Sequence, residues 1–389
     1  MSEPKHAAVS NEPVLHDPRW NDARWRSRLR VRLIKWFTMH ARALPWRTPV
    51  GEPLNDPYRV WISEIMLQQT QVATVTAYYK KFMKFYPKVE QLAAAEETAL
   101  MSQWEGLGYY RRARSMHAAA KQICEKHGGV FPTTYEDVIN LPGIGRYTAG
   151  AILSISQNQK VPILEGNTQR VFSRWAAVRG RLGEKGTTRL LWDIAEAMLP
   201  PSRQQQLATG PAVFNQAAME LGALVCTPRN PNCDECPVQT LCSAYKLGLQ
   251  EQIPGKVKNI KYEDRLEFAF VIANETGDRY LVRPIPKPER WAGLWDFPRV
   301  TNGKFESVAA AADFLGQELS GVVTPATSVA TIKHAVTKYR IRLEVFSATL
   351  SCKAKGRWKA DHPWSFVTAD ELRDLPMSAT GRKIADGIA

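Results

Sequence analysis

Four cysteines lie close together in the second half of the chain, in the pattern Cys226-x6-Cys233-x2-Cys236-x5-Cys242. Four thiolates at such short separation hold either a zinc ion or an iron–sulfur cluster, and either group forces the chain to wrap around it. Zinc sites of this kind usually have two tight cysteine pairs joined by a longer arm, whereas here only Cys233 and Cys236 form a tight pair. The spacing therefore favours a [4Fe–4S] cluster, with zinc and a disulfide pair as the alternatives.

The length and the charge of the chain limit its organisation and its partners. A chain of 389 residues is too long for one ordinary hydrophobic core, so two domains are expected. The formal net charge of +14 favours a polyanionic partner, the alternative being a basic surface that only aids solubility.

Neither an export signal nor a membrane span is evident in the sequence. Residues 1–16 are polar and lack the apolar core of a secretory signal, and no stretch approaches the about 18 apolar residues of a spanning helix. Cys124 and Cys352 are scattered, as in proteins of a reducing compartment. We therefore expect a cytoplasmic protein without membrane contact, associated with the nucleoid if its source is a bacterium.

Hydrophobic periodicity divides the chain into two unlike parts. Helical spacing, with apolar residues at i, i+3, i+4 and i+7, runs through the first part, and strand-like alternation dominates the second. The expected organisation is a disordered polar tail over residues 1–24, an all-α domain over 25–250 with the cysteine loop at 226–242, a linker over 251–264 and a smaller α+β domain over 265–389. Within the α+β domain, strands are expected over residues 266–272, 280–282 and 339–345, with one helix over 307–319.

A short glycine-containing turn joins two of the expected helices, with the sequence Leu141-Pro142-Gly143-Ile144-Gly145. Glycines allow positive φ and a close approach of the backbone to a ligand, and the amides that open the next helix favour a phosphate. The alternative is an ordinary turn between helices. Together with the cysteine cluster, the basic charge and the carboxylate of Glu165 downstream, the turn resembles the helix-hairpin-helix of the base-excision DNA glycosylase superfamily that includes endonuclease III.

Further motifs resemble one branch of that superfamily, the MutY family of adenine DNA glycosylases. They lie at residues 44–47, 60–72, 104–114 and 214–223, and the resemblance covers nearly the whole chain apart from the expected tail. It implies an all-α helix-hairpin-helix domain with a [4Fe–4S] loop, followed by an α+β MutT-like domain. It also implies a monomeric enzyme of base excision repair. Such an enzyme acts on double-stranded DNA with adenine opposite 8-oxoguanine or guanine, flips the adenine and hydrolyses its N-glycosidic bond.

Two carboxylates carry the expected chemistry. Breaking an N-glycosidic bond needs an acid that neutralises the departing base and a carboxylate that stabilises the positively charged sugar. Glu64 has apolar neighbours along its helix, so burial should raise its pKa and favour proton donation, which the resemblance directs to adenine N7. Glu165 takes the sugar-facing role by resemblance, and Asn167 would orient it by a hydrogen bond.

Glu165 is also the main departure from the family, which has an aspartate at this position. The additional methylene moves the carboxylate by roughly 1 Å, and a catalytic site that holds its groups to within about 0.5 Å is sensitive to such a shift. The residue is either a native variant with a compensating backbone shift or a substitution that slows the chemistry. In the second case the chain would be a catalytically impaired, lesion-binding protein.

Tyr147 bears on the mechanism because bifunctional relatives place a lysine at this position, and that lysine forms a Schiff base with the sugar. Tyrosine has no amine and cannot form this bond. We therefore expect a monofunctional glycosylase that leaves an abasic site without efficient strand cleavage. A glycosylase/lyase of the endonuclease III type is the rival enzyme, and both Tyr147 and the additional C-terminal domain argue against it.

The resemblance also assigns residues that displace and recognise the target base. Residues expected to insert into the base stack are Gln69, Thr70, Leu107 and Tyr109, and those expected to line the adenine pocket are Arg42, Trp46, Arg47, Gln68 and Glu220. The alternative for Tyr109 is a place in the hydrophobic core, and for Arg47 with Glu220 a structural salt bridge. Arg42 is further expected to support the catalytic carboxylates. Residues expected to meet DNA phosphates are Gly143, Gly145, Arg111, Arg112 and Arg114.

The C-terminal part resembles the MutT-like (Nudix) module of the same family, most clearly at residues 291–298. Residues 309–318 carry only two acidic side chains where a Nudix hydrolase needs a glutamate-rich helix for Mg²⁺, so nucleotide hydrolysis is not expected. The module is expected to recognise 8-oxoguanine through Val336, Thr337 and Lys338. Thr337 keeps the hydroxyl of the family's serine, whereas Lys338 replaces a histidine.

Overall fold

Both expected parts of the chain are present in the computed structural model, which describes residues 14–201, 207–255, 261–301, 305–352 and 363–388. The chain divides into a helical unit of residues 1–93 and 118–258 and a mixed unit of residues 94–117 and 259–389. The expected fold class, a helical domain followed by an α+β domain, is confirmed. Within the described ranges, no helix combines the length and the apolar character needed to cross a membrane.

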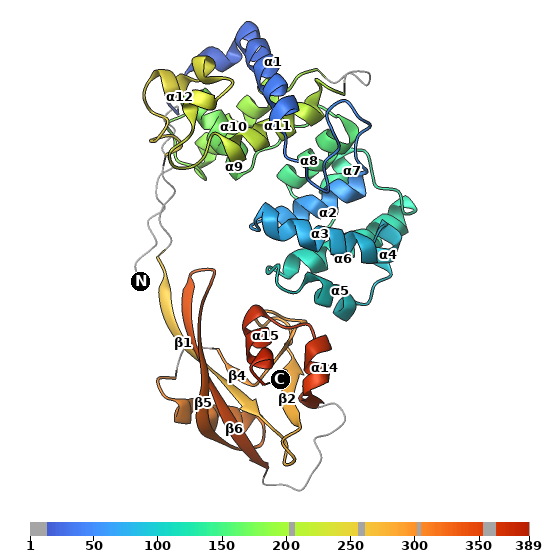
Figure 1. Cartoon of the computed structure of the whole chain (residues 1–389), viewed down its shortest axis with the longest axis vertical. Coiled ribbons are helices and arrows are strands. Elements are labelled where there is room, and N and C mark those ends of the chain that lie inside the picture. Colours follow the sequence, from blue (N-terminus) through green and yellow to red (C-terminus); the bar gives the residue numbers. More distant parts are fainter. Residues whose placement is uncertain (1–13, 202–206, 256–260, 302–304, 353–362, 389) are drawn as a thin grey trace, which may run out of the picture. The chain divides into compact units, whose positions relative to one another are not determined.

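The helical unit consists of helices joined by loops (Figure 1). The bounds are η1 Pro18–Asn21, α1 Ala23–His40, α2 Pro57–Leu67, α3 Val72–Phe85, α4 Val89–Ala93, α7 Tyr135–Ile139, α8 Arg146–Gln157, α9 Gly166–Trp175, α10 Lys185–Met198, α11 Pro211–Leu224, η2 Cys233–Glu235, η3 Gln239–Leu241 and α12 Ser243–Lys246, while α6 (Arg111–His127) runs through both units. The start of α2 illustrates why helices begin where they do. Pro57 occupies a first-turn position where no backbone N–H is needed, and the Asp56 carboxylate accepts a hydrogen bond from the Tyr58 N–H at 2.7 Å.

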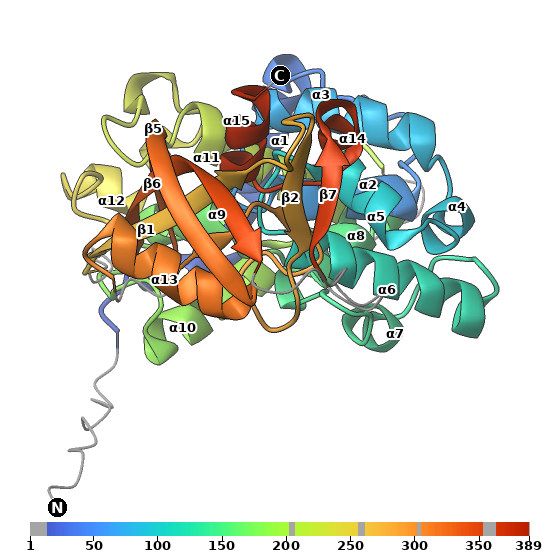
Figure 2. The same cartoon turned by 90° about the horizontal axis from the view of Figure 1, so that it is seen from below.

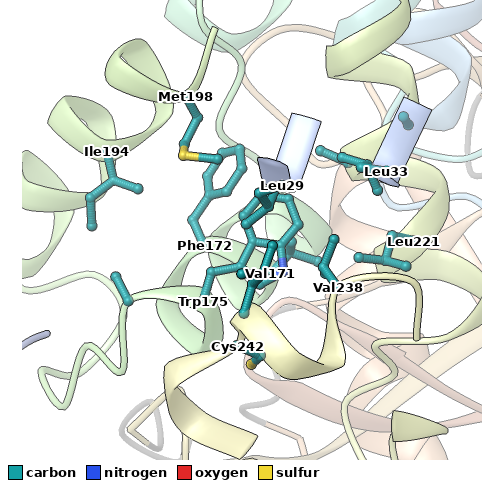
Figure 3. Close-up of a cluster of buried hydrophobic side chains, with 14 of the residues drawn as sticks. Leu29, Leu33, Val171, Phe172, Trp175, Ile194, Met198, Leu221, Val238 and Cys242 are labelled. Carbon is teal, nitrogen blue, oxygen red and sulfur yellow. The ribbon is translucent and has the colours of Figure 1, made fainter. Parts of the chain in front are cut away.

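A hydrophobic core joins α1, α9, α10 and α11 (Figure 3). Leu29 and Leu33 of α1 are fully buried, and they share this core with Phe172 of α9 and Met198 of α10. Burying a side chain of this size stabilises the fold by about 1.5–3 kcal/mol. Cys242 lies in the same core, so the cysteine loop is fastened to helices that precede it in the sequence.

Residues 14–24 belong to the folded helical unit instead of forming the disordered tail expected over residues 1–24. The Asp17 N–H donates to the Ala176 carbonyl at 2.7 Å, and Trp20 packs against the core. One backbone hydrogen bond and one tryptophan give no hydrophobic period, which is why the sequence pattern did not reveal this segment. The rest of the expected tail lies outside the described residues.

The two ends of the expected linker, residues 251–264, belong to the two units. Ile253 is buried in the helical unit, where its carbonyl accepts a hydrogen bond from Arg174 Nε at 2.9 Å. Glu263 already begins strand β1 of the mixed unit. Residues 256–260, between them, lie outside the described residues.

Two sheets form the strand-containing part of the mixed unit. A four-stranded sheet has the order β4-β1-β6-β5, with β1 parallel to β6 and the other pairs antiparallel, and a three-stranded sheet has the antiparallel order β3-β2-β7. Figure 2 shows strands β2 and β7 running side by side. The bounds are β1 Glu263–Ile272, β2 Arg279–Pro284, β3 Trp295–Asp296, β4 Arg299–Val300, α13 Val308–Glu318, β5 Gly321–Val336, β6 Tyr339–Cys352, β7 Ser365–Thr368, α14 Ala369–Asp374 and α15 Ala379–Asp386.

The expected strands and helix of this unit are confirmed, but the long strand β5 was not expected. Most of its side chains are exposed, and its register shifts twice between Pro325 and Ala330. A strand with few buried side chains and an irregular register lacks the apolar alternation on which a sequence-based prediction depends.

Residues 94–117 group with the C-terminal residues, although the expected all-α domain of residues 25–250 includes them. The segment contains α5 (Glu97–Trp104), whose helical period is confirmed. The Arg382 guanidinium donates to the Glu105 carboxylate at 2.7 Å across 277 residues of sequence, and further contacts of this kind are described below. Periodicity identifies a helix but not its partner, so the sequence pattern could not assign this segment.

Candidate active site

One pocket of about 510 Å³ in the helical unit brings together the side chains expected to catalyse and to recognise the base. The expected residues that line it are Arg42, Trp46, Arg47, Glu64, Gln68, Gln69, Thr70, Tyr147, Glu165, Asn167 and Glu220. They are supplied by α2, α8, the start of α9, α11 and the loops that precede and follow α2. The expected set is therefore assembled by the fold around a single cavity.

Glu64 lies on α2 with only 4% of its surface exposed. Burial, the largest influence, raises the pKa of Glu64 to about 7, and the negative charge of Glu165 acts in the same direction. A hydrogen bond from Tyr147 and the charge of Arg47 oppose the shift. Near neutral pH a substantial fraction of this carboxyl is therefore protonated, as an acid catalyst requires.

Tyr147 makes a contact that the sequence did not reveal. Its hydroxyl, at the second position of α8, donates a hydrogen bond to Glu64 Oε2. Burial and the neighbouring carboxylates hold the pKa of Tyr147 well above its usual value, so the phenol stays a hydrogen-bond donor. The two residues are 83 positions apart, and no local pattern links a tyrosine on one helix to a glutamate on another.

Glu165 caps the N-terminus of α9. Its Oε2 accepts hydrogen bonds from the Asn167 N–H at 2.9 Å and from Asn167 Nδ2 at 3.3 Å, and its Oε1 accepts from the Thr168 N–H at 2.9 Å. The orienting hydrogen bond expected from Asn167 is thus present. Burial raises the pKa of Glu165 while these hydrogen bonds lower it, burial having the larger influence. The helix dipole also stabilises the negative charge of a carboxylate at a helix N-terminus.

Asn167 is itself fixed by its neighbours. Its Oδ1 accepts a hydrogen bond from Arg170 Nη2 at 2.7 Å, which leaves the amide nitrogen directed at Glu165. On α11, a Cβ atom at Gly222 would lie 2.6 Å from Asn167 Cβ. A glycine is therefore needed on α11 for the start of α9 to approach so closely.

Glu220 is held by two arginines that line the same pocket. Arg42 donates from Nε and Nη2 at 2.8 Å each, and Arg47 Nη2 donates at 3.1 Å. Burial would raise the pKa of Glu220, but the hydrogen bonds from Arg42 and Arg47 outweigh it and lower the pKa to about 2. The salt bridge considered for Arg47 and Glu220 is confirmed, and Arg42 pairs with Glu220 rather than with Glu64 or Glu165.

The loop after α2 carries the expected stacking residues Gln69 and Thr70. Gln69 has a φ of +57°, a left-handed conformation that costs a residue other than glycine about 1–3 kcal/mol. Strain of this kind is retained where the surrounding structure requires it, as at ligand sites. Gln68 lies beside it and donates to Thr148 Oγ1 at 3.4 Å.

The glycine-containing turn joins α7 to α8. Gly143 has a φ of +78°, and Gly145 caps α8 without a side-chain hydrogen bond to the first amides of the helix. Among the described residues, no heavy atom lies within 4 Å of a Cβ atom built at Gly145, so the space beside this residue is open. A phosphate at this helix start stays a prediction, for which the geometry leaves room.

In the mixed unit, the structure separates the expected DNA-contacting residues. Tyr109 is 56% exposed, while Leu107 is buried with 5% exposed, so only Tyr109 of this pair is presented at the surface. Arg112 and Arg114, expected at phosphates, donate hydrogen bonds to backbone carbonyls of the same unit, and Arg111 is exposed. Arg112 and Arg114 are therefore structural in this conformation.

The three expected lesion-recognition residues form the tip of the β5–β6 hairpin. Val336 ends β5, and Thr337 and Lys338 make the two-residue turn, with Thr337 at a φ of +53°. Lys338 Nζ lies 2.5 Å from the carboxylate of Glu263, and the Thr337 hydroxyl donates to the Val336 carbonyl. Both side chains are exposed, and the contact of Lys338 with Glu263 joins residues 75 positions apart.

The four cysteines line one small cavity beside Arg174. All four are free of disulfide bonds, which contradicts the disulfide alternative. Arg174 is buried; its Nη1 donates to Cys226 Sγ at 3.2 Å, and its carbonyl accepts from Cys242 Sγ at 3.3 Å. Among the described residues, no three or more His, Cys, Asp or Glu side chains are grouped so as to hold a metal ion. A cavity lined by four cysteines, with a cation alongside, fits a cluster that carries negative charge.

Comparisons with known proteins identify the parts of the chain. Residues 62–197 match the model of the HhH-GPD superfamily base excision DNA repair proteins, and residues 268–387 match the NUDIX domain. Residues 226–242 match the iron-sulfur binding domain of endonuclease III, so the four cysteines are those of an iron–sulfur site. The zinc alternative is thereby set aside.

Curated relatives match between about half and nearly all of the chain. An adenine DNA glycosylase of Rattus norvegicus is 31% identical over 99% of this chain and 82% of that protein. One of Arabidopsis thaliana is 32% identical over 92% of this chain and 64% of that protein, and one of Mus musculus is 43% identical over 58% and 44%. The chain thus spans less than two thirds of the length of the last two. Because the similarity to these relatives extends over most of its length, the chain belongs to the MutY family of adenine DNA glycosylases.

Proposed function

We propose that the chain removes adenine mispaired with 8-oxoguanine, and less efficiently with guanine, from double-stranded DNA. The observation that carries the proposal is the pairing of a buried, partly protonated Glu64 with the capping carboxylate of Glu165 in one pocket. Further support comes from the relatives' name, adenine DNA glycosylase. A pocket of about 510 Å³ has room for a flipped base.

The reaction begins with proton transfer from Glu64. The carboxyl proton passes to N7 of the flipped adenine, the C1′–N9 bond breaks, and its electron pair leaves with the now neutral base. The sugar becomes a cation, which the negative charge of Glu165 stabilises; a water then adds to C1′ and its proton passes to the Glu64 carboxylate, which restores the acid. The hydroxyl of Tyr147 orients the acid.

Tyr147 also limits the outcome of the reaction. Without an amine at this position the sugar is not captured as a Schiff base, so the product is an abasic site in an intact strand. Around the acid, Arg42 and Arg47, which the ionised Glu220 holds in place, offer fixed donors for the acceptor atoms of a purine edge.

The DNA duplex is the proposed partner, bound by a monomer. A net charge of +14, the open helix start at Gly145 and the exposed Arg111 suit a phosphate backbone. Gln69, Thr70 and Tyr109 would enter the base stack, and the β5–β6 tip with Thr337 would contact 8-oxoguanine.

A single-turnover assay tests the proposal against its two rivals. A duplex with one adenine opposite 8-oxoguanine is incubated with excess protein, and strand breaks are measured with and without alkali. Adenine release that needs alkali to break the strand supports the proposal, and breaks without alkali support the glycosylase/lyase. Tight binding without release supports a catalytically impaired lesion binder, which the extra methylene of Glu165 favours.

The protonation of Glu64 predicts how the reaction rate depends on pH. Its pKa is raised from 4.5 to about 7, so the acid is protonated below this pH and ionised above it. We expect kcat/KM for adenine release to fall about tenfold per pH unit above about pH 7. A rate that rises above about pH 7 would contradict the assignment.

The folded chain also binds the proton more tightly than the unfolded chain, so the contribution of Glu64 to stability is lost as pH rises from 4.5 to about 7.

Iron analysis tests the proposed [4Fe–4S] cluster, whose role would be to hold the loop of residues 226–242. The purified chain should be brown, absorb broadly near 400 nm and contain about four irons. Cys236→Ser should lose most of the iron and colour, because one ligand is gone. Cys124→Ser, which changes a cysteine outside the loop, is the control and should retain both. Stoichiometric zinc without iron in anaerobic preparations would contradict the prediction.

A further inference from the structure

The loop that carries Tyr109 has an unusual backbone. Gly106, Gly108 and Tyr109 have φ values of +90°, +68° and +48°, so three of its four residues from 106 to 109 are left-handed. For tyrosine this conformation is unfavourable, and it persists only where neighbouring groups require it. The loop nevertheless presents Tyr109 with 56% of its surface exposed.

Local hydrogen bonds hold the middle of the loop. Trp104 Nε1 donates to the Gly108 carbonyl at 3.1 Å, and Arg112 Nη2 donates to the Leu107 carbonyl at 3.0 Å. The Arg112 guanidinium also lies 5.6 Å from the centre of the Tyr109 ring. These contacts shape the loop from the two helices that flank it.

The ends of the loop are bonded to the C-terminal residues of the same unit. The Glu105 carboxylate accepts two hydrogen bonds from the Arg382 guanidinium, at 2.7 and 3.2 Å, and one from the Met377 N–H at 3.3 Å. The Tyr110 hydroxyl donates to the Met377 carbonyl at 3.1 Å and accepts from the Gly106 N–H at 3.4 Å. Both neighbours of the loop are therefore fastened to the segment that opens α15.

The contact between Glu105 and Arg382 can hold the start of the loop at a defined place relative to α14 and α15. The two side chains are 19% and 22% exposed, so water screens the pair only partly. A forked guanidinium on a carboxylate fixes orientation as well as distance. Arg382 also donates to the Leu372 and Leu375 carbonyls, which anchors it to α14 independently of Glu105.

We propose that Glu105 and Arg382 are positioning residues for base displacement: through them, the C-terminal end of the chain holds residues 106–109 so that Tyr109 can enter the base stack. The inference rests on the proposed function, in which Tyr109 helps to displace the adenine. It adds to the Nudix-like part of the chain a role separate from contact with the opposite base.

Glu105→Ala tests the proposal, because Arg382 keeps its two carbonyl acceptors and the C-terminal helices keep their anchor. A loop displaced by roughly 1 Å should slow single-turnover release of adenine by about 10- to 100-fold. The fluorescence rise of 2-aminopurine, placed at the target position, should also be lost, since that signal reports unstacking and not bond cleavage. Glu64→Gln should show the opposite pattern, with unstacking retained and release lost.

Three comparisons separate this role from a general effect on folding. Asp370→Ala, which removes an exposed pair with Arg373 on α14, should leave release and fluorescence unchanged. Arg382→Gln combined with Glu105→Ala should be no slower than the slower single variant, because both remove one contact. If Glu105→Ala fails to fold, Glu105→Gln, which removes the charge but keeps an acceptor, is measured instead.

The outcomes also distinguish failure of this inference from failure of the proposed function. If the parent chain releases no adenine, the proposed function fails. If the parent releases adenine and the folded Glu105 variants match it within about twofold in rate and fluorescence, the positioning role is overturned.

Discussion

Glu64→Gln should reduce the single-turnover rate of adenine release by about 10²- to 10⁴-fold. The amide keeps the shape of the carboxyl and can still accept the hydrogen bond from Tyr147, but it has no acidic proton to give the departing base. Duplex affinity should be retained, because the pocket and the basic surface are unchanged. Alkaline cleavage of a labelled duplex measures the rate, and a gel-shift titration measures the affinity.

Tyr147→Phe is the matched comparison for that experiment. It removes the hydrogen bond to Glu64 but leaves the acid in place, so its effect should be much smaller than that of Glu64→Gln. Without this hydrogen bond, the pKa of Glu64 should rise further, since the contact lowers it. The fall of the rate with pH should then shift to higher pH. Release by Glu64→Gln within about tenfold of the parent would exclude Glu64 as the acid.

Glu165→Asp should raise the single-turnover rate, by up to roughly 100-fold if the longer side chain displaces its charge by about 1 Å from the sugar. The present carboxylate uses both oxygens to cap α9, and aspartate is a preferred capping residue, so the helix should remain intact. Affinity for DNA that contains a product-like abasic site should change little.

Glu165→Gln provides the control, because it keeps the length of the side chain and removes the charge. It should lose most of the activity whichever way the aspartate behaves. A Glu165→Asp variant that is equal to or slower than the parent would show that the backbone at α9 has adapted to glutamate. Glu165 would then be a working native residue, and the impaired form would no longer be an alternative.

The sequence predicted the parts of the site that depend on local pattern. The apolar neighbours of Glu64 predicted a buried acid with a raised pKa, and the family resemblance predicted the hydrogen bond between Asn167 and Glu165. The helix expected over residues 307–319 agrees with α13, because capping residues and hydrophobic spacing act over a few residues. The pattern of four cysteines likewise predicted a shared site.

Contacts between distant segments were not predictable in the same way. Arg42 meets Glu220 across 178 residues, and Glu105 meets Arg382 across 277, so no window of sequence contains both partners. The direction of a side chain is also not predictable from a motif alone. Leu107 and Tyr109 are two residues apart in one motif, but Leu107 is buried and Tyr109 is exposed. The left-handed backbone between them determines that difference.

The division of the mixed unit between residues 94–117 and 259–389 has a consequence for the order in which the chain is made. During synthesis, Glu105 and Tyr110 leave the ribosome long before Met377 and Arg382 exist, at about 5–20 residues per second. For that interval, the loop of residues 106–109 has only the support of its flanking helices. Closing a contact over 277 residues is also slow, because the connecting chain must first be ordered. Nascent chains should therefore acquire a folded helical unit first and a fully shaped Tyr109 loop only after Met377 and Arg382 have emerged.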